Sequence, residues 1–286
     1  MAKTAWIFPG QGSQKIGMGA DLFEQSELKA QLELAENILG WSVPEICNHP
    51  EDKISKTLYT QPCLYVVETL LVDRLKLEGQ SPDYVAGHSL GEYVALYAAG
   101  VFDFETGLTL VKRRAELMDS ADGGQMAALI GFKFEQLQEQ IQQTDNVVLA
   151  NDNSAAQVVI SGTPEAVDQV LANIKVKRAV KLNVSGAFHS PLMAEAATEF
   201  QQILDEIPFN NAQVPVLSNV DPTPTTDATL LKQRLTQQMT GSVRWREICL
   251  QLSALEVQQV VEIGPGNVLT GLMKRTCPEI MLQNIS

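Results

Sequence analysis

The sequence is poor in residues that hold metals or act as bases. Only three of its 286 residues are histidine and only four are cysteine, namely Cys47, Cys63, Cys249 and Cys277. The cysteines form no C-x-x-C pair and have no histidine at metal-ligand spacing, so we interpret them as buried, reduced thiols. We therefore expect no metal site, and chemistry that needs an imidazole has only three candidates.

Positive charge and long apolar runs are also scarce. The chain has 21 Lys and Arg against 34 Asp and Glu, a formal net charge of -13. This balance argues against a nucleic-acid partner, because phosphate binding needs a positive surface. No stretch approaches the roughly 18 apolar residues of a membrane span. The opening MAKTAWIFPG lacks the charged-then-apolar pattern of a signal peptide. We expect a cytoplasmic protein that does not bind membranes.

Apolar runs typical of strands alternate with helical patterns along the first 125 residues. AWIFP and DYVAGHS have strand character, and helical segments follow each of them. Such alternation predicts βα units and a parallel sheet covered by helices. One of these helices, in residues 103–120, has an apolar face, and we place Lys112, Arg113 and Arg114 on its other face.

The pattern changes between residues 126 and 190. MAALIG, VVLAN, QVVISG and AVKLNVS are typical of strands, and FEQLQEQIQQ and PEAVDQVLANI of helices. Thr163 before Pro164 predicts an N-cap for the second helix. The order β-α-β-β-α-β is the ferredoxin-like one. We predict an α/β-hydrolase-like large domain with a parallel sheet, in residues 1–125 and 191–286, and an inserted ferredoxin-like small subdomain in residues 126–190.

The segment GHSLG, residues 87–91, predicts a nucleophile. In a G-x-S-x-G turn a strand bends sharply into a helix, which projects the serine hydroxyl, and the glycines let neighbouring backbone pass closely. Strand-like DYVAG precedes the turn here and a helical pattern follows it. Ser89 is therefore the candidate nucleophile. The alternative is a chance pentapeptide in an ordinary βα turn.

A serine hydroxyl needs an adjacent base to become a good nucleophile. His88 points away from its neighbour at a tight turn, so we expect it to have a packing role. His49 lies in the polar turn NHPEDK, where we expect it to be solvated. By elimination His189, in GAFHSPLM, is the candidate base. No Asp or Glu has a distinguishing context as a third member, and a backbone carbonyl would hold the imidazole as well.

A tetrahedral intermediate also needs N–H donors for its oxyanion. Leu90, directly after the nucleophile, is expected to supply one. The PGQG loop after the first strand is the candidate for the second, at Gln11, because glycines let this backbone approach a substrate. A glycine-rich turn after a strand is common, so the evidence for Gln11 as an oxyanion donor is weaker than the evidence for Leu90.

Five segments together carry a family resemblance. They are FPGQGSQ (8–14), TQP (60–62), GHSLGEY (87–93), AFHSPLM (187–193) and EIGPGNVLTGL (262–272). In this order they resemble the malonyl-CoA:acyl carrier protein transacylases of bacterial-type fatty acid synthesis. The resemblance implies a ping-pong reaction in which Ser89 takes malonyl from malonyl-CoA, and the phosphopantetheine thiol of holo acyl carrier protein accepts it. His189 is then the base in both halves, and no cofactor is implied.

The resemblance also assigns residues around this pair. The family orients its histidine with the main-chain carbonyl of a glutamine, and QMTGSVRW places that role on Gln238. TLVKRRAELM aligns Arg114 with an arginine that clamps the malonyl carboxylate; taken alone, Arg114 looks like a solvated helix charge. GAFH resembles malonyl-selective enzymes, with Phe188 leaving little room for the methyl of methylmalonyl. Gln61 either contributes a polar group or simply belongs to the first turn of a helix.

Carrier proteins of this family are acidic, so docking to this acidic chain requires local positive surface. The densest basic run is IKVKRAVK, with Lys175, Lys177, Arg178 and Lys181. We interpret it as a candidate docking site, and the alternative is a strand edge protected by lysines. The resemblance further implies a cytoplasmic monomer.

Three other functions remain open from the sequence. A serine hydrolase or esterase would use the same Ser89–His189 pair, with water in place of the thiol. A non-catalytic scaffold would bind acyl carriers without acylation, although retention of the serine, the base and the arginine argues against it. Because the chain starts at its own Met1 with no flanking domain, we also consider a free-standing acyltransferase that loads a polyketide synthase.

Overall fold

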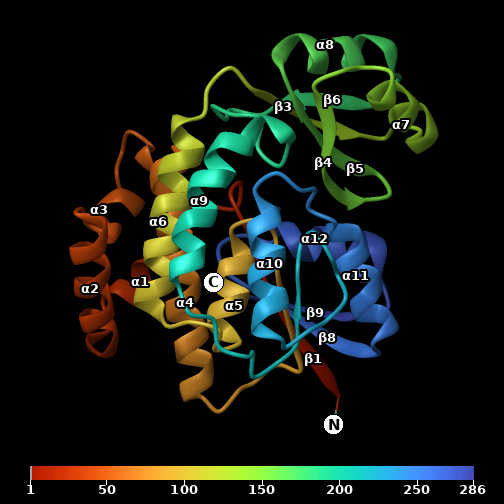
Figure 1. Cartoon of the computed structure of the whole chain (residues 1–286). Helices are drawn as coiled ribbons and strands as arrows, with labels where there is room; N and C mark the ends of the chain where they lie inside the picture. Colours follow the sequence, from red (N-terminus) through yellow and green to blue (C-terminus); the bar gives the residue numbers. More distant parts are fainter. Residues whose placement is uncertain (1) are drawn as a thin grey trace.

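The computed structural model describes residues 2–286 and contains a parallel and an antiparallel sheet (Figure 1). The parallel sheet has the strand order β7-β2-β1-β8-β9. Its strands are β1 (Lys3–Phe8), β2 (Tyr84–Gly87), β7 (Val216–Leu217), β8 (Val257–Ile263) and β9 (Met281–Ile285). Residues 5–8 of β1 are all buried, as expected for a strand covered on both faces. The predicted parallel sheet is confirmed.

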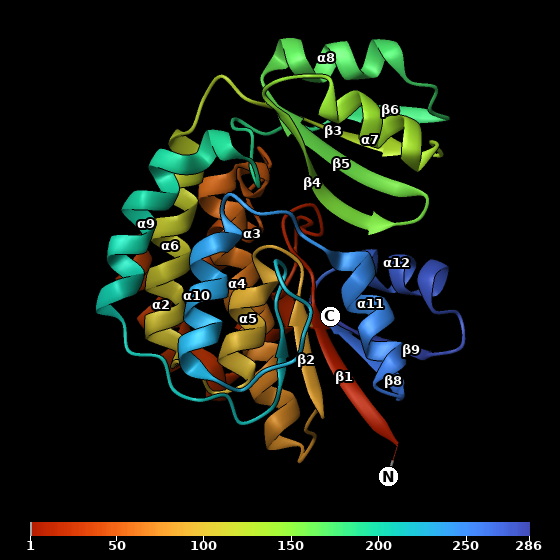
Figure 2. The ribbon, with the colours of Figure 1, turned by 45° about the vertical axis from the view of Figure 1, so that its right-hand side comes forward.

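Helices cover both faces of the parallel sheet (Figure 2). On one face lie α2 (Lys29–Leu39), α4 (Thr57–Leu77), α5 (Gly91–Ala98), α6 (Phe104–Ser120), α9 (Ala194–Glu206) and α10 (Ala228–Gln238), with the short α1 (Ala20–Phe23) and α3 (Val43–Cys47). On the other lie α11 (Trp245–Ala254) and α12 (Val268–Thr276). Successive strand residues face opposite ways. Trp6 and Phe8 therefore pack in the core beneath the helices that include α4, α5 and α6, and Ala5 and Ile7 pack in the core beneath α11 and α12. None of the helices in residues 2–286 is long and apolar enough to span a membrane.

The antiparallel sheet lies beyond the carboxyl ends of β1 and β2 (Figure 2). It consists of β3 (Gln125–Ile130), β4 (Val147–Ser154), β5 (Gln157–Gly162) and β6 (Arg178–Lys181), in the order β4-β5-β3-β6. Helices α7 (Phe134–Gln142) and α8 (Pro164–Asn173) pack on it. This is the ferredoxin-like order, so that prediction is confirmed. Thr163 caps α8 by accepting from the Ala166 N–H at 3.3 Å. The domain limits at residues 125 and 190 stay predictions.

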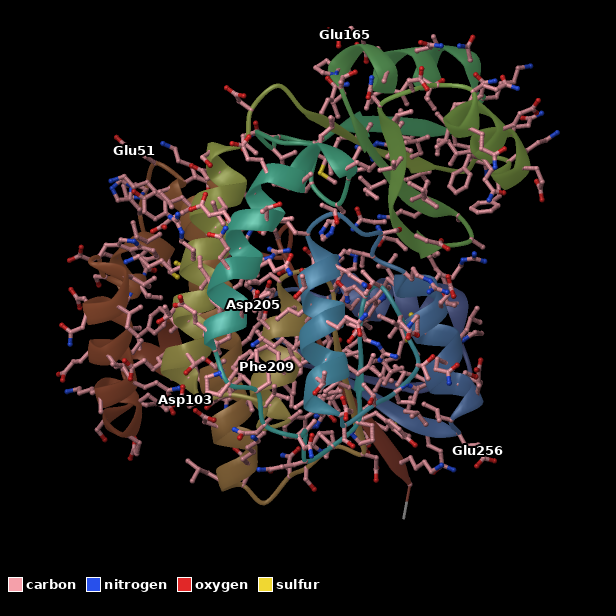
Figure 3. The ribbon with its side chains drawn as sticks, viewed as in Figure 1. Glu51, Asp103, Glu165, Asp205, Phe209 and Glu256 are labelled. Atoms are coloured by element: carbon pink, nitrogen blue, oxygen red, sulfur yellow. The ribbon has the colours of Figure 1, made fainter. Side chains whose placement is uncertain are left out.

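Helix α6 differs from its prediction at one position. Asp103, labelled in Figure 3, caps the helix by accepting from the Thr106 N–H at 2.9 Å. We expected Arg114 on the solvated face, but its side chain is only 1% exposed. Arg114 is three residues after Val111 and four before Met118, both of which are buried, so helical spacing places it on the apolar stripe.

Candidate active site

The GHSLG segment forms the turn from β2 into α5. Ser89 has φ 52°, a left-handed conformation that is uncommon outside glycine. A Cβ on Gly87 would lie 1.9 Å from the backbone of Gly91, and a Cβ on Gly91 would lie 2.1 Å from the Phe8 carbonyl oxygen. The turn is therefore possible only with glycine on both sides of the serine, which is the physical reason for the sequence pattern.

Ser89 lies in hydrogen-bond contact with a histidine from a distant part of the chain. Its Oγ is 2.8 Å from His189 Nε2, and His189 Nδ1 is 2.9 Å from the carbonyl oxygen of Gln238. Gln238 is the last residue of α10, where carbonyls have no partner within the helix, so this one is free to accept. It fixes the imidazole proton on Nδ1 and leaves Nε2 to accept from the serine hydroxyl.

The surroundings keep His189 neutral. The side chain is 4% exposed, and burial together with the nearby Arg114 guanidinium lowers the pKa of His189 to about 3. A neutral imidazole is the form that takes a proton from a hydroxyl. No carboxylate in residues 2–286 hydrogen-bonds to His189, and the carbonyl of Gln238 occupies the position that an aspartate has in a Ser-His-Asp triad.

A buried guanidinium lies beside the serine. Arg114 donates to Gln61 Oε1 at 2.7 Å, to Ser89 Oγ at 3.0 Å and to Gln238 Oε1 at 3.1 Å. Its carbon Cζ lies 5.3 Å from the centre of the Tyr93 ring. Burial lowers the pKa of Arg114, but a guanidinium stays charged in proteins. Within the described chain it forms no salt bridge.

A cavity of about 220 Å³ lies between the two sheets and includes Ser89 and His189. Gln11, Gln61 and Phe188 line it from the large part of the chain, and Met126 and Val159 from the antiparallel sheet. The structure thus brings five predicted residues together at one cavity. It also places this cavity at the carboxyl ends of parallel strands, where α/β proteins commonly bind ligands.

Two backbone amides near the serine are free to donate. Neither the Leu90 N–H nor the Gln11 N–H hydrogen-bonds to another atom of residues 2–286. A Cβ on Gly10 would lie 2.3 Å from the carbonyl oxygen of His88, so glycine is what lets the loop that carries Gln11 approach the turn. The Gln11 side chain donates to Thr57 Oγ1 at 2.9 Å, which holds this loop against α4.

The sequence analysis did not single out two buried residues that hold this turn. Asn219 Oδ1 accepts from the Ser89 N–H at 2.7 Å, and its Nδ2 donates to the Gly87 carbonyl at 2.6 Å. Glu92 Oε2 accepts from the Asn219 N–H at 3.1 Å and from Gln238 Nε2 at 2.8 Å. The available signal was a polar residue after the apolar strand PVLS and a carboxylate in an apolar helix.

The other two histidines lie away from the serine hydroxyl. His88 is partly buried, and its Nε2 lies 2.8 Å from Asn153 Oδ1 on the antiparallel sheet. Its ring packs near Trp245, with centroids 5.6 Å apart. His49 is partly exposed, and its Nδ1 accepts from the Glu51 N–H at 3.2 Å. Of the three histidines, His189 alone hydrogen-bonds to Ser89.

The basic run lies on the antiparallel sheet. Strand β6 pairs only with β3, so it is an edge strand. The side chains of Lys175, Lys177, Arg178 and Lys181 are all exposed. Lys181 forms a salt bridge of 2.6 Å with Asp168. An exposed basic run on an edge strand agrees with both interpretations, a docking site and a strand edge protected by lysines.

Comparisons with known proteins identify the family. The model of the acyl transferase domain family matches residues 5–285. A malonyl CoA-acyl carrier protein transacylase from Synechocystis sp. is 59% identical over 283 residues, with 99% of this chain and 97% of the relative covered. A polyketide biosynthesis malonyl CoA-acyl carrier protein transacylase from Bacillus subtilis is 43% identical, with 94% and 96% covered.

Solved structures agree with the sequence relatives. The crystal structure of the Synechocystis malonyl-CoA:ACP transacylase matches with a TM-score of 0.97, covering 99% of this chain and 97% of that one. A malonyl-transacylase in complex with its type II polyketide synthase acyl-carrier protein matches with a TM-score of 0.93 at 36% identity, covering 99% and 96%. The chain therefore belongs to the acyl transferase family, and it is similar along its whole length to malonyl CoA-acyl carrier protein transacylases.

Proposed function

We propose that this protein transfers malonyl from malonyl-CoA to the phosphopantetheine thiol of holo acyl carrier protein through an acyl-enzyme on Ser89. One observation carries the proposal. Ser89 Oγ lies 2.8 Å from a neutral histidine and 3.0 Å from an arginine that forms no salt bridge in the described chain. A nucleophile, a base and a buried cation in contact suit a thioester that carries a free carboxylate, as malonyl-CoA does.

In the first half-reaction Ser89 Oγ attacks the thioester carbonyl carbon while His189 Nε2 takes the hydroxyl proton. A C–O bond forms, and the carbonyl oxygen becomes an oxyanion that accepts from the N–H groups of Leu90 and Gln11. Collapse breaks the C–S bond, and the coenzyme A sulfur leaves with the proton from His189. The Gln238 carbonyl stabilises the transient imidazolium through Nδ1–H.

The second half-reaction reverses these roles. His189 takes the proton of the phosphopantetheine thiol, and the thiolate attacks the malonyl ester on Ser89. The C–O bond breaks, and Ser89 Oγ recovers the proton from His189. Every atom and charge is accounted for by the two thiols and the chain itself, so the reaction as written needs no metal and no further cofactor.

Three side chains are proposed to select the acyl group. Arg114 pairs with the malonyl carboxylate, for which a planar guanidinium offers two parallel donors. Gln61 accepts from Arg114 at 2.7 Å, which orients the guanidinium, and it also lines the cavity. Phe188 is buried at the cavity wall, where it limits space for an added methyl. One methyl changes selectivity by only about 1–3 kcal/mol.

The proposed partner surface is the exposed basic run on and before β6, namely Lys175, Lys177, Arg178 and Lys181. Positive charge attracts an acidic carrier and steers its approach. We place the reaction in fatty acid synthesis, because identity is higher to a transacylase without a polyketide designation than to the polyketide-associated relative. A clear preference for a polyketide carrier protein in a direct comparison would reverse that assignment.

The test is the intact-protein mass after brief mixing with malonyl-CoA, for the native protein and for Ser89→Ala, followed by addition of holo acyl carrier protein. The proposal predicts a malonyl adduct that requires Ser89 and moves to the carrier faster than into water. An adduct that is lost equally fast without carrier would indicate a hydrolase. No adduct would support a non-catalytic scaffold.

A further inference from the structure

Glu92 is a buried carboxylate that the reaction as written does not use. It lies in the first turn of α5, three residues after Ser89, and its side chain is 1% exposed. One carboxylate oxygen, Oε2, accepts from the Asn219 N–H at 3.1 Å and from Gln238 Nε2 at 2.8 Å. Glu92 is not among the residues that line the cavity, and its carboxylate makes no hydrogen bond to Ser89 or His189 in the described chain.

The two partners of Glu92 hold opposite sides of the reacting pair. Asn219 bonds to the backbone of Ser89 and Gly87, on both sides of the left-handed turn. Gln238 presents its carbonyl to His189 Nδ1, accepts from Arg114 and donates to the Ser89 carbonyl at 2.9 Å. A single carboxylate oxygen therefore connects the residue that fixes the nucleophile with the residue that orients the base.

We propose that Glu92 is a positioning residue, which holds Ser89 and His189 at proton-transfer distance by fixing Asn219 and Gln238. The inference rests on the proposed function, because it concerns how fast the Ser89 acyl-enzyme forms. Proton transfer depends steeply on this geometry, and a misplacement of about 1 Å can cost about 100-fold in rate.

The property that matters is the position of an acceptor oxygen, not a full charge. Burial raises the pKa of Glu92, while its amide donors and Arg114 oppose that shift. Glu92 forms no salt bridge with Arg114. A glutamine carbonyl oxygen accepts the same two hydrogen bonds from the same place, whereas alanine leaves both donors without an acceptor.

A competing explanation is that Glu92 only stabilises the fold. A carboxylate in the first turn of a helix interacts favourably with the helix dipole. This explanation predicts a lower melting temperature for Glu92→Ala with an unchanged rate in the folded fraction. It also predicts that Glu92→Asp, which keeps the charge near the helix N-terminus, behaves like the native protein.

The experiment measures single-turnover acylation by malonyl-CoA with rapid quenching and intact mass, for Glu92→Ala, Glu92→Gln and Glu92→Asp. We expect Glu92→Ala to acylate about 100-fold more slowly with little change in the concentration of malonyl-CoA that gives half the maximal rate. Glu92→Gln should recover to within about fivefold of native. Glu92→Asp should stay slow, because its shorter side chain does not reach both donors.

Glu68→Ala is the matched control. Glu68 is also a fully buried glutamate of the large core, but neither of its carboxylate oxygens hydrogen-bonds to another described residue. Deleting it tests the general effect of removing a buried carboxyl group. We expect a native acylation rate for the folded control, as judged by thermal unfolding of each variant.

A native rate in folded Glu92→Ala or Glu92→Asp would overturn the inference, as would a Glu92→Gln variant as slow as alanine. If Glu92→Ala does not fold, the acylation rates of Glu92→Gln and Glu92→Asp decide between positioning and stabilisation of the fold. If native protein forms no malonyl adduct, the proposed substrate fails instead. The same variants are then compared with p-nitrophenyl acetate, an activated ester that acylates an accessible serine without needing a carboxylate clamp.

Discussion

Replacing Arg114 with alanine should slow acylation by malonyl-CoA far more than acylation by acetyl-CoA. The guanidinium is buried, donates to Ser89 Oγ and forms no salt bridge in the described chain. A hydrogen bond to a charged group is worth about 1.5–3 kcal/mol, so a two-donor pair with the malonyl carboxylate is worth about 3–6 kcal/mol. At 1.4 kcal/mol per factor of ten, malonyl acylation should fall about 100- to 20,000-fold.

The acetyl group has no free carboxylate to pair with Arg114. Its acylation rate therefore measures the part of the Arg114→Ala effect that comes from disturbing the site's structure. Alanine leaves Gln61 Oε1 and Gln238 Oε1 without the Arg114 donor, and we expect this to slow acetyl acylation about tenfold or less. The assay is single-turnover acylation of Ser89 by each thioester, read by intact mass. Arg113→Ala is the matched control, because Arg113 is the neighbouring arginine but is partly exposed and paired with Glu116.

The comparison between malonyl-CoA and acetyl-CoA decides whether Arg114 binds the malonyl carboxylate. A fall by the same factor for malonyl and acetyl would mean that Arg114 only supports the structure of the site. A comparable loss in Arg113→Ala would show that positive charge near the cavity matters, and not the buried guanidinium. Arg114→Lys should recover part of the malonyl rate, because a lysine keeps the charge but lacks the planar pair of donors.

Three other measurements test separate features. Because burial and Arg114 lower the pKa of His189 to about 3, the imidazole stays unprotonated on mild acidification. The single-turnover acylation rate should therefore be flat from about pH 8 to about pH 5, and an inflection near 6.5 would contradict this. Gly91→Ala places a Cβ 2.1 Å from a backbone carbonyl oxygen, so its free energy of unfolding should fall by at least about 2 kcal/mol. Gly271→Ala, in open space within α12, should change it by about 1 kcal/mol or less in the stabilising direction, and the reverse order would refute the steric argument. Charge reversal at Lys177 and Arg178 should raise the KM for holo carrier protein without changing the rate of malonyl acylation, and an unchanged KM would remove this docking surface.

Interactions between residues close in sequence determined the turn at Ser89 and the strands and helices of the antiparallel part. The glycines around Ser89 predicted a strained turn, because only glycine tolerates the 1.9 and 2.1 Å approaches that the structure shows. Strand and helix patterns in residues 126–185 predicted the order of the antiparallel sheet, since each period reflects contacts between neighbours in sequence. Helical spacing would also have placed Arg114 on the buried stripe, had it been applied to a charged residue.

The tertiary structure decided how the site is assembled. Ser89 and His189 are 100 positions apart, and Gln238 Nε2 reaches the Ser89 carbonyl over 149 positions. Elimination identified the histidine and family resemblance identified Gln238, but neither gave a distance. Asn219 and Glu92 had no role before the fold brought them beneath the turn. Local periodicity carries no information on which distant polar groups meet, because those meetings follow from the packing of whole helices and strands.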